Sequence, residues 1–192
     1  MKSPDDNSMV AAIHESGHAA LAFIQGVAVD SITVNAGVGE TNLGGNVHMR
    51  FAKEDDWRHA NTKIAIAGTI SESFYLRCQK MRLAEAAAMP PAEFFQWLRL
   101  AHPLERTVDT RRVAMFCRQF SKTPRETEAK AHQLFIEVHS AITDPHVWPT
   151  IENLAVELAS RRATRGFRRM SSKHLEPFRR QIENAFNFGP LA

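Results

Sequence analysis

The sequence MVAAIHESGHAALAFIQ, residues 9–25, decides the fold, because it predicts an apolar helix that carries the most informative polar residues of the chain. Its apolar residues recur at the spacing of one helical face, at Val10, Ile13, Leu21 and Ile24. Asn7 or Ser8 precedes the run as a candidate N-cap, and Gly26 follows it where a C-cap glycine belongs. We therefore expect a helix from Met9 to Gln25.

The pentapeptide His14-Glu15-Ser16-Gly17-His18 lies inside this run and matches the HExxH pattern. Residues four apart share a helical face, so both imidazoles can reach one metal ion. Glu15 stands beside that face, where its carboxylate can take a proton from a water that the metal activates, the chemistry of amide hydrolysis. Gly17 predicts close packing of another backbone, since glycine within a helix costs about 1 kcal/mol relative to alanine. The alternative is two partly buried histidines hydrogen-bonded to neighbours without a metal.

Length and composition predict one globular domain. The chain has 192 residues and is 44% hydrophobic, enough for a core of ordinary size. The N-terminal residues Met1-Lys2-Ser3-Pro4-Asp5-Asp6 have no secretory apolar core, and no run approaches the roughly 18 apolar residues of a membrane span. We therefore expect a cytoplasmic protein without a membrane span. Cys78 and Cys117 lack metal-ligand spacing and are expected to be reduced thiols.

Basic residues concentrate near the C-terminus, although the formal net charge is only +3. The cluster consists of Arg161, Arg162, Arg165, Arg168, Arg169, Lys173, Arg179 and Arg180. Such a cluster can bind nucleic acid, an acidic protein surface or a membrane face, or it can be a solvated turn between helices. We expect the solvated turn and no nucleic-acid binding, because no aromatic interleaving or recognised nucleic-acid motif accompanies the cluster.

The remaining patterns predict a mainly α chain with a small β-sheet, an α+β fold. Short strands are expected at residues 29–34 and 44–51. Helices are expected at 55–77 and 104–120, from a capping box at Thr123-Pro124-Arg125-Glu126 toward Val138, after Asp144-Pro145, and from Ser171 or Ser172. No GxxxxGK[ST] motif is present, so we expect no nucleotide binding.

Domain organisation follows from these elements. Residues 1–192 are expected to form a single peptidase-like domain, with residues 1–8 as a flexible N-terminus. The proline-marked segment 79–103 is expected to be an insertion or lid, with a short helix at 92–100. Residues 123–186 are expected to form a C-terminal helical region.

A third metal ligand must come from elsewhere, because a catalytic zinc usually takes three protein ligands. Asp109 shares a helical stripe with Val113, Phe116, Cys117 and Phe120, which predicts an inward carboxylate. Glu72 is its rival, on a stripe with Ala65, Gly68 and Tyr75. We rank Asp109 as the ligand and Glu72 as an acceptor that orients a ligand histidine or a neighbouring amide. Either could instead be an ordinary surface charge. Ile24 stands where metzincins place a third histidine.

Several motifs in the same order resemble the peptidase domain of FtsH-type ATP-dependent zinc metalloproteases. These are Ala12-Ile13-His14-Glu15-Ser16-Gly17-His18-Ala19, Ser31-Ile32-Thr33-Val34, Leu43-Gly44-Gly45-Asn46-Val47 and Ile66-Ala67-Gly68-Thr69-Ile70-Ser71-Glu72. The resemblance continues with Asp109, three residues after Arg106 at the head of a helix, and with the C-terminal helices. The family's Gly-Ala-Ser-Asn before the ligand aspartate is replaced here by residues 105–108.

The resemblance implies an FtsH-protease-like helical domain built around the HExxH helix, with Zn²⁺ as cofactor. His14, His18 and Asp109 would be the zinc ligands and Glu15 the general base. The strand that carries Gly45, Asn46 and Val47 would be an edge that pairs with an extended substrate. The family's membrane anchors and ATPase are absent from this sequence, which implies substrates that are peptides, flexible tails or proteins delivered by a partner. That partner would be a separate ATPase, and assembly as a homo-oligomer is open.

Together these features predict a zinc-dependent metalloendopeptidase that cleaves unfolded or flexible polypeptides. The alternative is a non-catalytic module of the same fold. It would bind a partner through the exposed edge strand or through the basic cluster at residues 161–180.

Overall fold

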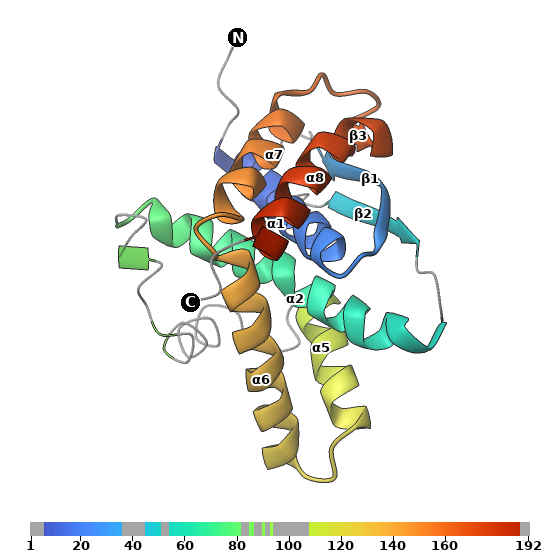
Figure 1. Ribbon diagram of the computed structural model, residues 1–192, viewed down its shortest axis with the longest axis vertical. Helices are drawn as coiled ribbons and strands as arrows, with labels where there is room; N and C mark the ends of the chain where they lie inside the picture. The colour runs from blue at the N-terminus through green and yellow to red at the C-terminus, as the bar shows by residue number, and fades with distance from the viewer. Residues whose placement is uncertain are drawn as a thin grey trace.

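The computed structural model describes residues 6–35, 45–50, 54–81 and 108–188, together with residues 85, 86, 90 and 93. These residues form a mainly helical fold with one small sheet, as predicted (Figure 1). The elements are α1 (Asp6–Ile24), β1 (Ala28–Asn35), β2 (Gly45–Arg50), α2 (Glu54–Cys78), α5 (Val108–Gln119), α6 (Pro124–Ile142), α7 (Trp148–Ser160), β3 (Phe167–Ser171) and α8 (Ser172–Phe188). Among the described residues, no helix is long and apolar enough to cross a membrane.

The predicted HExxH helix, α1, is the core helix of the molecule. It packs against α2, α7, α8 and the sheet, and its residues from Ala11 to Phe23 are nearly all buried. A helix that is apolar on all sides is stable only when it is covered on all sides. Helix α1 begins at Asp6, three residues before the predicted start at Met9.

Gly17 lets α1 and α2 approach each other closely. A Cβ at this position would lie 2.8 Å from the carbonyl oxygen of Ala67 and closer still to the side chain of Ser71. The predicted close packing of another backbone against Gly17 is confirmed. It brings α2 alongside the two histidines of the motif.

The sheet is antiparallel, with strand order β2-β1-β3. Ile32 of β1 pairs with Val47 of β2 and Met170 of β3, and all three side chains are buried in the core. Both predicted strands therefore exist, and β2 lies at an edge of the sheet as expected. Because β2 also contacts α1, this edge lies near the HExxH helix.

The strand β3 was not predicted, because the cluster around Arg161 to Arg180 was expected to be a solvated turn between helices. A turn is present at Arg165 and Gly166, whose φ angles are 52° and 81°. Thr164 and Phe167 exchange backbone hydrogen bonds of 2.8 and 3.1 Å across it, which makes a two-residue hairpin turn. The strand that follows buries only Met170, so it lacks the alternating apolar pattern by which strands are predicted.

Polar side chains at the preceding turns mark where α6 and α7 begin. Thr123 Oγ1 accepts a hydrogen bond from the backbone N of Glu126 at 3.2 Å, so the predicted N-cap of α6 is confirmed. The Glu126 carboxylate accepts from the backbone N of Lys122 at 2.6 Å, one residue before the cap. The next helix, α7, begins at Trp148 and not directly after Asp144, because the Asp144 carboxylate accepts from the backbone N of His146 in a turn.

Two further predictions concern the middle of the chain. The lid proposed for residues 79–103 and its short helix at 92–100 lie almost wholly outside the described residues. Cys78 and Cys117 are both free thiols, with Cys117 buried and Cys78 half-buried.

Candidate metal centre

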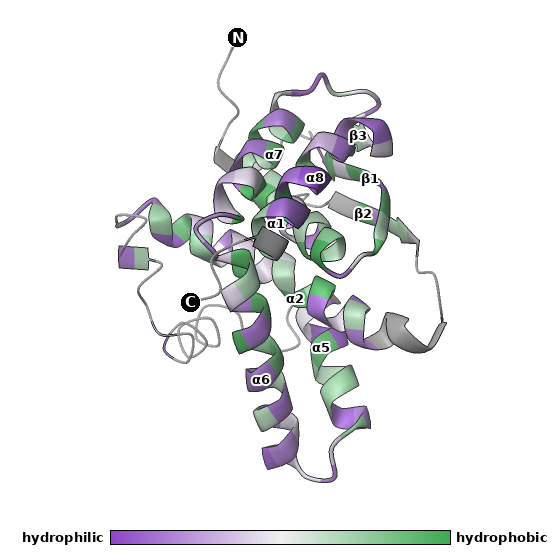
Figure 2. Cartoon of the chain, in the orientation of Figure 1, coloured by the Kyte–Doolittle hydropathy of each residue, from purple (hydrophilic) through white to green (hydrophobic). Residues whose placement is uncertain are grey.

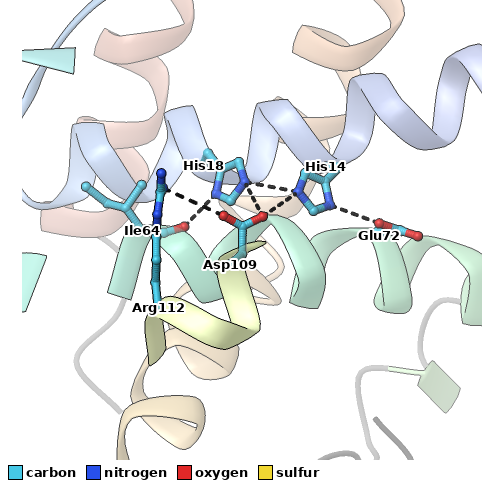
Figure 3. A network of polar contacts seen from close by, with 6 residues as sticks. All are labelled: His14, His18, Ile64, Glu72, Asp109 and Arg112. Carbon is cyan, nitrogen blue, oxygen red and sulfur yellow. Dashed lines mark hydrogen bonds and ion pairs between the residues drawn. The ribbon is translucent and has the colours of Figure 1, made fainter. Parts of the chain in front are cut away.

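The structure brings together the three predicted metal ligands, His14, His18 and Asp109. One potential ligand atom from each lies within 4.8 Å of the others. Both histidines come from α1, and Asp109 comes from the first turn of α5 (Figure 3). These residues could hold a metal ion.

The spacing of the ligand atoms fits a small tetrahedral ion. Nε2 of His14 lies 3.0 Å from Nε2 of His18. Oδ2 of Asp109 lies 3.3 Å from Nε2 of His14 and 3.6 Å from Nε2 of His18. Bonds of about 2.0–2.2 Å at tetrahedral angles separate neighbouring ligand atoms by about 3.4 Å. The triangle therefore has the size that a four-coordinate zinc requires.

Each histidine is oriented from behind by an acceptor on α2. Nδ1 of His18 lies 2.6 Å from the carbonyl oxygen of Ile64, and Nδ1 of His14 lies 2.9 Å from Oε2 of Glu72 (Figure 3). A carbonyl oxygen only accepts, so Nδ1 of His18 carries a proton, and Nε2 is the ring nitrogen that faces the cluster. Glu72 thus occupies the predicted place of an acceptor behind a ligand histidine.

Gly68 gives the two histidines the space that they occupy. A Cβ at this position would lie 2.5 Å from Nε2 of His18 and 2.8 Å from Nε2 of His14. Only a glycine lets α2 pass this close to the atoms that face the cluster. Sequence reasoning placed Gly68 on the inward stripe with Glu72 but missed this role; the signal was its position one turn before a residue already expected at the site.

The stripe that pointed to Asp109 is partly confirmed. Val113 and Cys117 are buried and Phe116 is half-buried, so this face of α5 does meet the core. Phe120 is exposed, because α5 ends at Gln119. The prediction of an inward carboxylate depended on the first turns of the helix, and there the stripe holds.

The charges of the cluster stabilise one another. Burial lowers the pKa of His14, but hydrogen bonds with Asp109 and Glu72 and the charges of Glu15 and Glu72 outweigh it and raise that pKa to about 10. Burial raises the pKa of Asp109, but hydrogen bonds to His14 and His18 and their charges hold it below its usual range. Asp109 is therefore ionised, as a metal ligand must be.

Glu15 is a buried carboxylate beside the ligands, with 6% of its surface exposed. Burial raises its pKa, and the charges of His18 and His14 oppose that shift. A carboxylate with a raised pKa is a stronger proton acceptor than an ordinary surface glutamate. Its place beside both histidines agrees with the prediction from the motif.

Arg112 is a neighbour of the cluster that sequence reasoning missed. Its Nη1 lies 3.9 Å from Oδ1 of Asp109, the oxygen that does not contact the histidines. The signal that could have revealed it is the spacing of three residues on one helix, which places side chains next to each other.

The predicted substrate strand lies at the sheet edge on β2, where Gly45 and Asn46 pair with Val34 and Thr33 of β1. The side chain of Val47 is buried in the core, which leaves only its backbone for a substrate. His48, the next residue, is exposed.

The basic cluster runs from the C-cap of α7 through β3 to α8, and several of its members bind acidic neighbours. Arg161 pairs with Glu157 at 2.8 Å. Arg179 and Arg180 both pair with Glu176, at 2.9 and 2.8 Å. In these pairs the guanidinium groups already bind carboxylates, so they are less available to an external anion.

The chain was compared with models of protein families, with curated proteins and with solved structures, and none of the three comparisons found a match.

Proposed function

We propose that this chain is a zinc-dependent metalloendopeptidase of the FtsH-like type that cleaves unfolded or flexible polypeptides. The observation that carries the proposal is the position of Glu15, a buried carboxylate beside His14, His18 and Asp109. A purely structural metal site gains nothing from a carboxylate held there as a proton acceptor.

Zinc is the metal that the donor set favours, because two imidazoles and one carboxylate at tetrahedral spacing match its preferred ligands. When bound, it would supply Lewis acidity that polarises the scissile carbonyl and lowers the pKa of a water. Ile64 and Glu72 hold the histidine rings in place through Nδ1.

Glu15 performs the proton transfers in the proposed reaction. It accepts a proton from the attacking water and then donates that proton to the leaving amine. Burial raises the pKa of Glu15, which strengthens it as the base of the first step, and the same carboxyl group then holds the proton that the leaving amine takes up.

The edge strand β2 is the proposed binding site for the substrate backbone. An extended polypeptide can add to a sheet edge through main-chain hydrogen bonds, which select for chain conformation more than for sequence. The proposed substrates are therefore chains that are already unfolded or that a separate ATPase delivers. Assembly into a homo-oligomer is compatible with this activity.

The test is cleavage of an unfolded protein by the zinc-loaded chain, with product peptides identified by mass spectrometry. We expect cleavage by the wild type, its loss with a chelator, and a rate at least about a hundredfold lower for Glu15→Gln, which keeps the three ligands. Glu128 is an exposed residue of α6, and Glu128→Gln is the matched control, which should cleave like the wild type.

The alternative is a non-catalytic binding module that acts through the β2 edge or the basic cluster. If the wild type and Glu15→Gln both bind zinc and neither cleaves unfolded proteins or a peptide library, the peptidase proposal is wrong and this alternative takes its place.

A further inference from the structure

A groove lies between α2 and α5, and one of its lining residues, Arg112, lies 3.9 Å from Asp109 of the candidate metal centre. Among the described residues its lining includes Asn61 and Thr62 from α2, and Arg112, Met115, Phe116 and Arg118 from α5. Its volume is about 590 Å³, within the range of pockets that bind several side chains or a small ligand.

One wall of this α2/α5 groove is apolar and open to solvent. Met115 is 64% exposed, which is unusual for a large apolar side chain on a helix. The ring of Phe116 lies 5.7 Å from the ring of His59 and 4.9 Å from the ring of Phe120. This stacking holds Phe116 in place, so the wall is preformed.

Arg112 connects the groove with the cluster of ligands. Asp109 presents Oδ2 to the histidines and Oδ1 to Arg112 (Figure 3), and Arg112 also lines the groove. The Arg112 side chain is 55% exposed, and its nearest contact to Asp109 is 3.9 Å. An ion pair so long and so exposed contributes little, which leaves the Arg112 guanidinium able to bind another carboxylate at small cost.

The charge on α5 has one sign on its exposed surface. Arg111, Arg112 and Arg118 are exposed, whereas Asp109, the only acidic residue of this helix, faces the histidines. Hydrophobic residues lie between these basic ones along α5 (Figure 2). A surface of this kind complements a polypeptide that carries both carboxylates and large apolar side chains.

We propose that the α2/α5 groove is a specificity subsite for polypeptide segments in which an acidic residue neighbours a large apolar one. Arg112 binds the carboxylate of the segment, and Met115 and Phe116 bind its apolar side chain. The proposal rests on the proposed peptidase function, because the groove selects what reaches Glu15. It makes Arg112 a specificity-determining residue with no part in the chemistry.

The test is peptide binding to the full chain, zinc-loaded, in the Glu15→Gln background so that cleavage does not interfere. The probes are a fluorescein-labelled peptide in which Glu flanks Leu and Phe, and its copy with Gln in place of Glu. We expect the acidic peptide to bind about tenfold more tightly, as for one charge-assisted hydrogen-bonded pair, measured by fluorescence anisotropy.

Two substitutions separate the two parts of the groove. Arg112→Gln should bring the ratio of the two affinities close to one, while Met115→Ser should weaken both peptides and keep the ratio. The matched control is Arg162→Gln, an exposed arginine after α7, which should leave both affinities unchanged. Zinc content, measured on each variant, should equal that of the parent.

The inference is overturned if Arg112→Gln keeps the preference for the acidic peptide, or if Arg162→Gln removes it equally. Its failure is distinguishable from failure of the peptidase proposal. Cleavage without an Arg112-dependent preference overturns the subsite alone, and an Arg112-dependent preference without cleavage by the wild type supports the subsite and overturns the peptidase.

Discussion

Gly68 of α2 lies so close to His18 of α1 that a Cβ on it would be 2.5 Å from Nε2, the nitrogen that faces the candidate metal. A Cβ this close to the ring would require an imidazole to shift. The candidate metal centre thus depends on a residue that offers no ligand.

The first prediction is that Gly68→Ala weakens zinc binding. Overpacking costs about 1–3 kcal/mol, and here the atoms it displaces are ligand nitrogens, so we expect a loss of about tenfold to a hundredfold in affinity. Competition with a chromophoric chelator measures the affinity, and thermal unfolding in chelator measures the stability of the metal-free chain. Unchanged zinc affinity in a folded Gly68→Ala variant would show that α2 does not confine the histidines.

The second prediction concerns the two carboxylates near His14. Asp109→Ala removes a proposed ligand, whereas Glu72→Ala removes only the acceptor near Nδ1 of His14. Loss of such an acceptor weakens metal affinity by about 10–100-fold, and loss of a ligand should cost more. The same chelator competition ranks the two variants, and the reverse order would identify Glu72 as the ligand.

The third prediction is that acid destabilises the fold through His139. This side chain is 2% exposed, and burial lowers its pKa to about 4. The unfolded chain therefore binds more protons than the folded one between about pH 4 and the ordinary histidine pKa of about 6.5. The contribution of neutral His139 to the free energy of unfolding is fully present above about pH 6.5. That free energy falls by up to about 3 kcal/mol as the pH falls from about 6.5 to about 4.

Urea unfolding in chelator at several pH values measures this dependence. His139→Phe keeps an aromatic ring between Phe74 and Phe135 and removes the titrating group. Its free energy of unfolding should vary less with pH than that of the wild type between pH 4 and 6.5. Equal slopes for the two proteins would show that His139 is not the group responsible.

The fourth prediction concerns the turn before β3, where Arg165 and Gly166 both have positive φ angles. Gly166→Ala should lower the free energy of unfolding by about 1–2 kcal/mol, because a Cβ is strained in this region. Arg165→Asn should raise it slightly, since asparagine tolerates the left-handed conformation better than arginine. Chemical denaturation measures the free energy of unfolding of both variants. Changes of the same sign in the two variants would contradict the left-handed conformation at Arg165 and Gly166.

Sequence patterns predicted the parts of this fold that depend on local periodicity. The helix around His14 and the stripe below Asp109 each repeat an apolar pattern over several turns, which is long enough to be recognised. The contact between His14 and Asp109, which are 95 residues apart, is a tertiary contact that local periodicity does not predict. It was predicted only because a zinc site needs a third ligand.

The parts that were missed have no such local signal. The strand β3 buries a single side chain, and the role of Gly68 exists only when α1 and α2 are packed together. In the sequence Arg112 is one basic residue among many, and its place beside the site is evident only from its contact with Oδ1 of Asp109. In each case the information lies in the contact between elements and not in either segment.

The way α2 meets the two histidines also decides how the two helices can be aligned. Three residues spaced by four, Ile64, Gly68 and Glu72, supply in turn a carbonyl for His18, a gap for both rings and a carboxylate for His14. If α2 slid by one turn, about 5.4 Å, a side chain would fill the gap and at least one ring would lose its acceptor. The contacts of His14 and His18 with α2 are therefore satisfied in only one alignment of α1 and α2, and this selection does not require a metal ion.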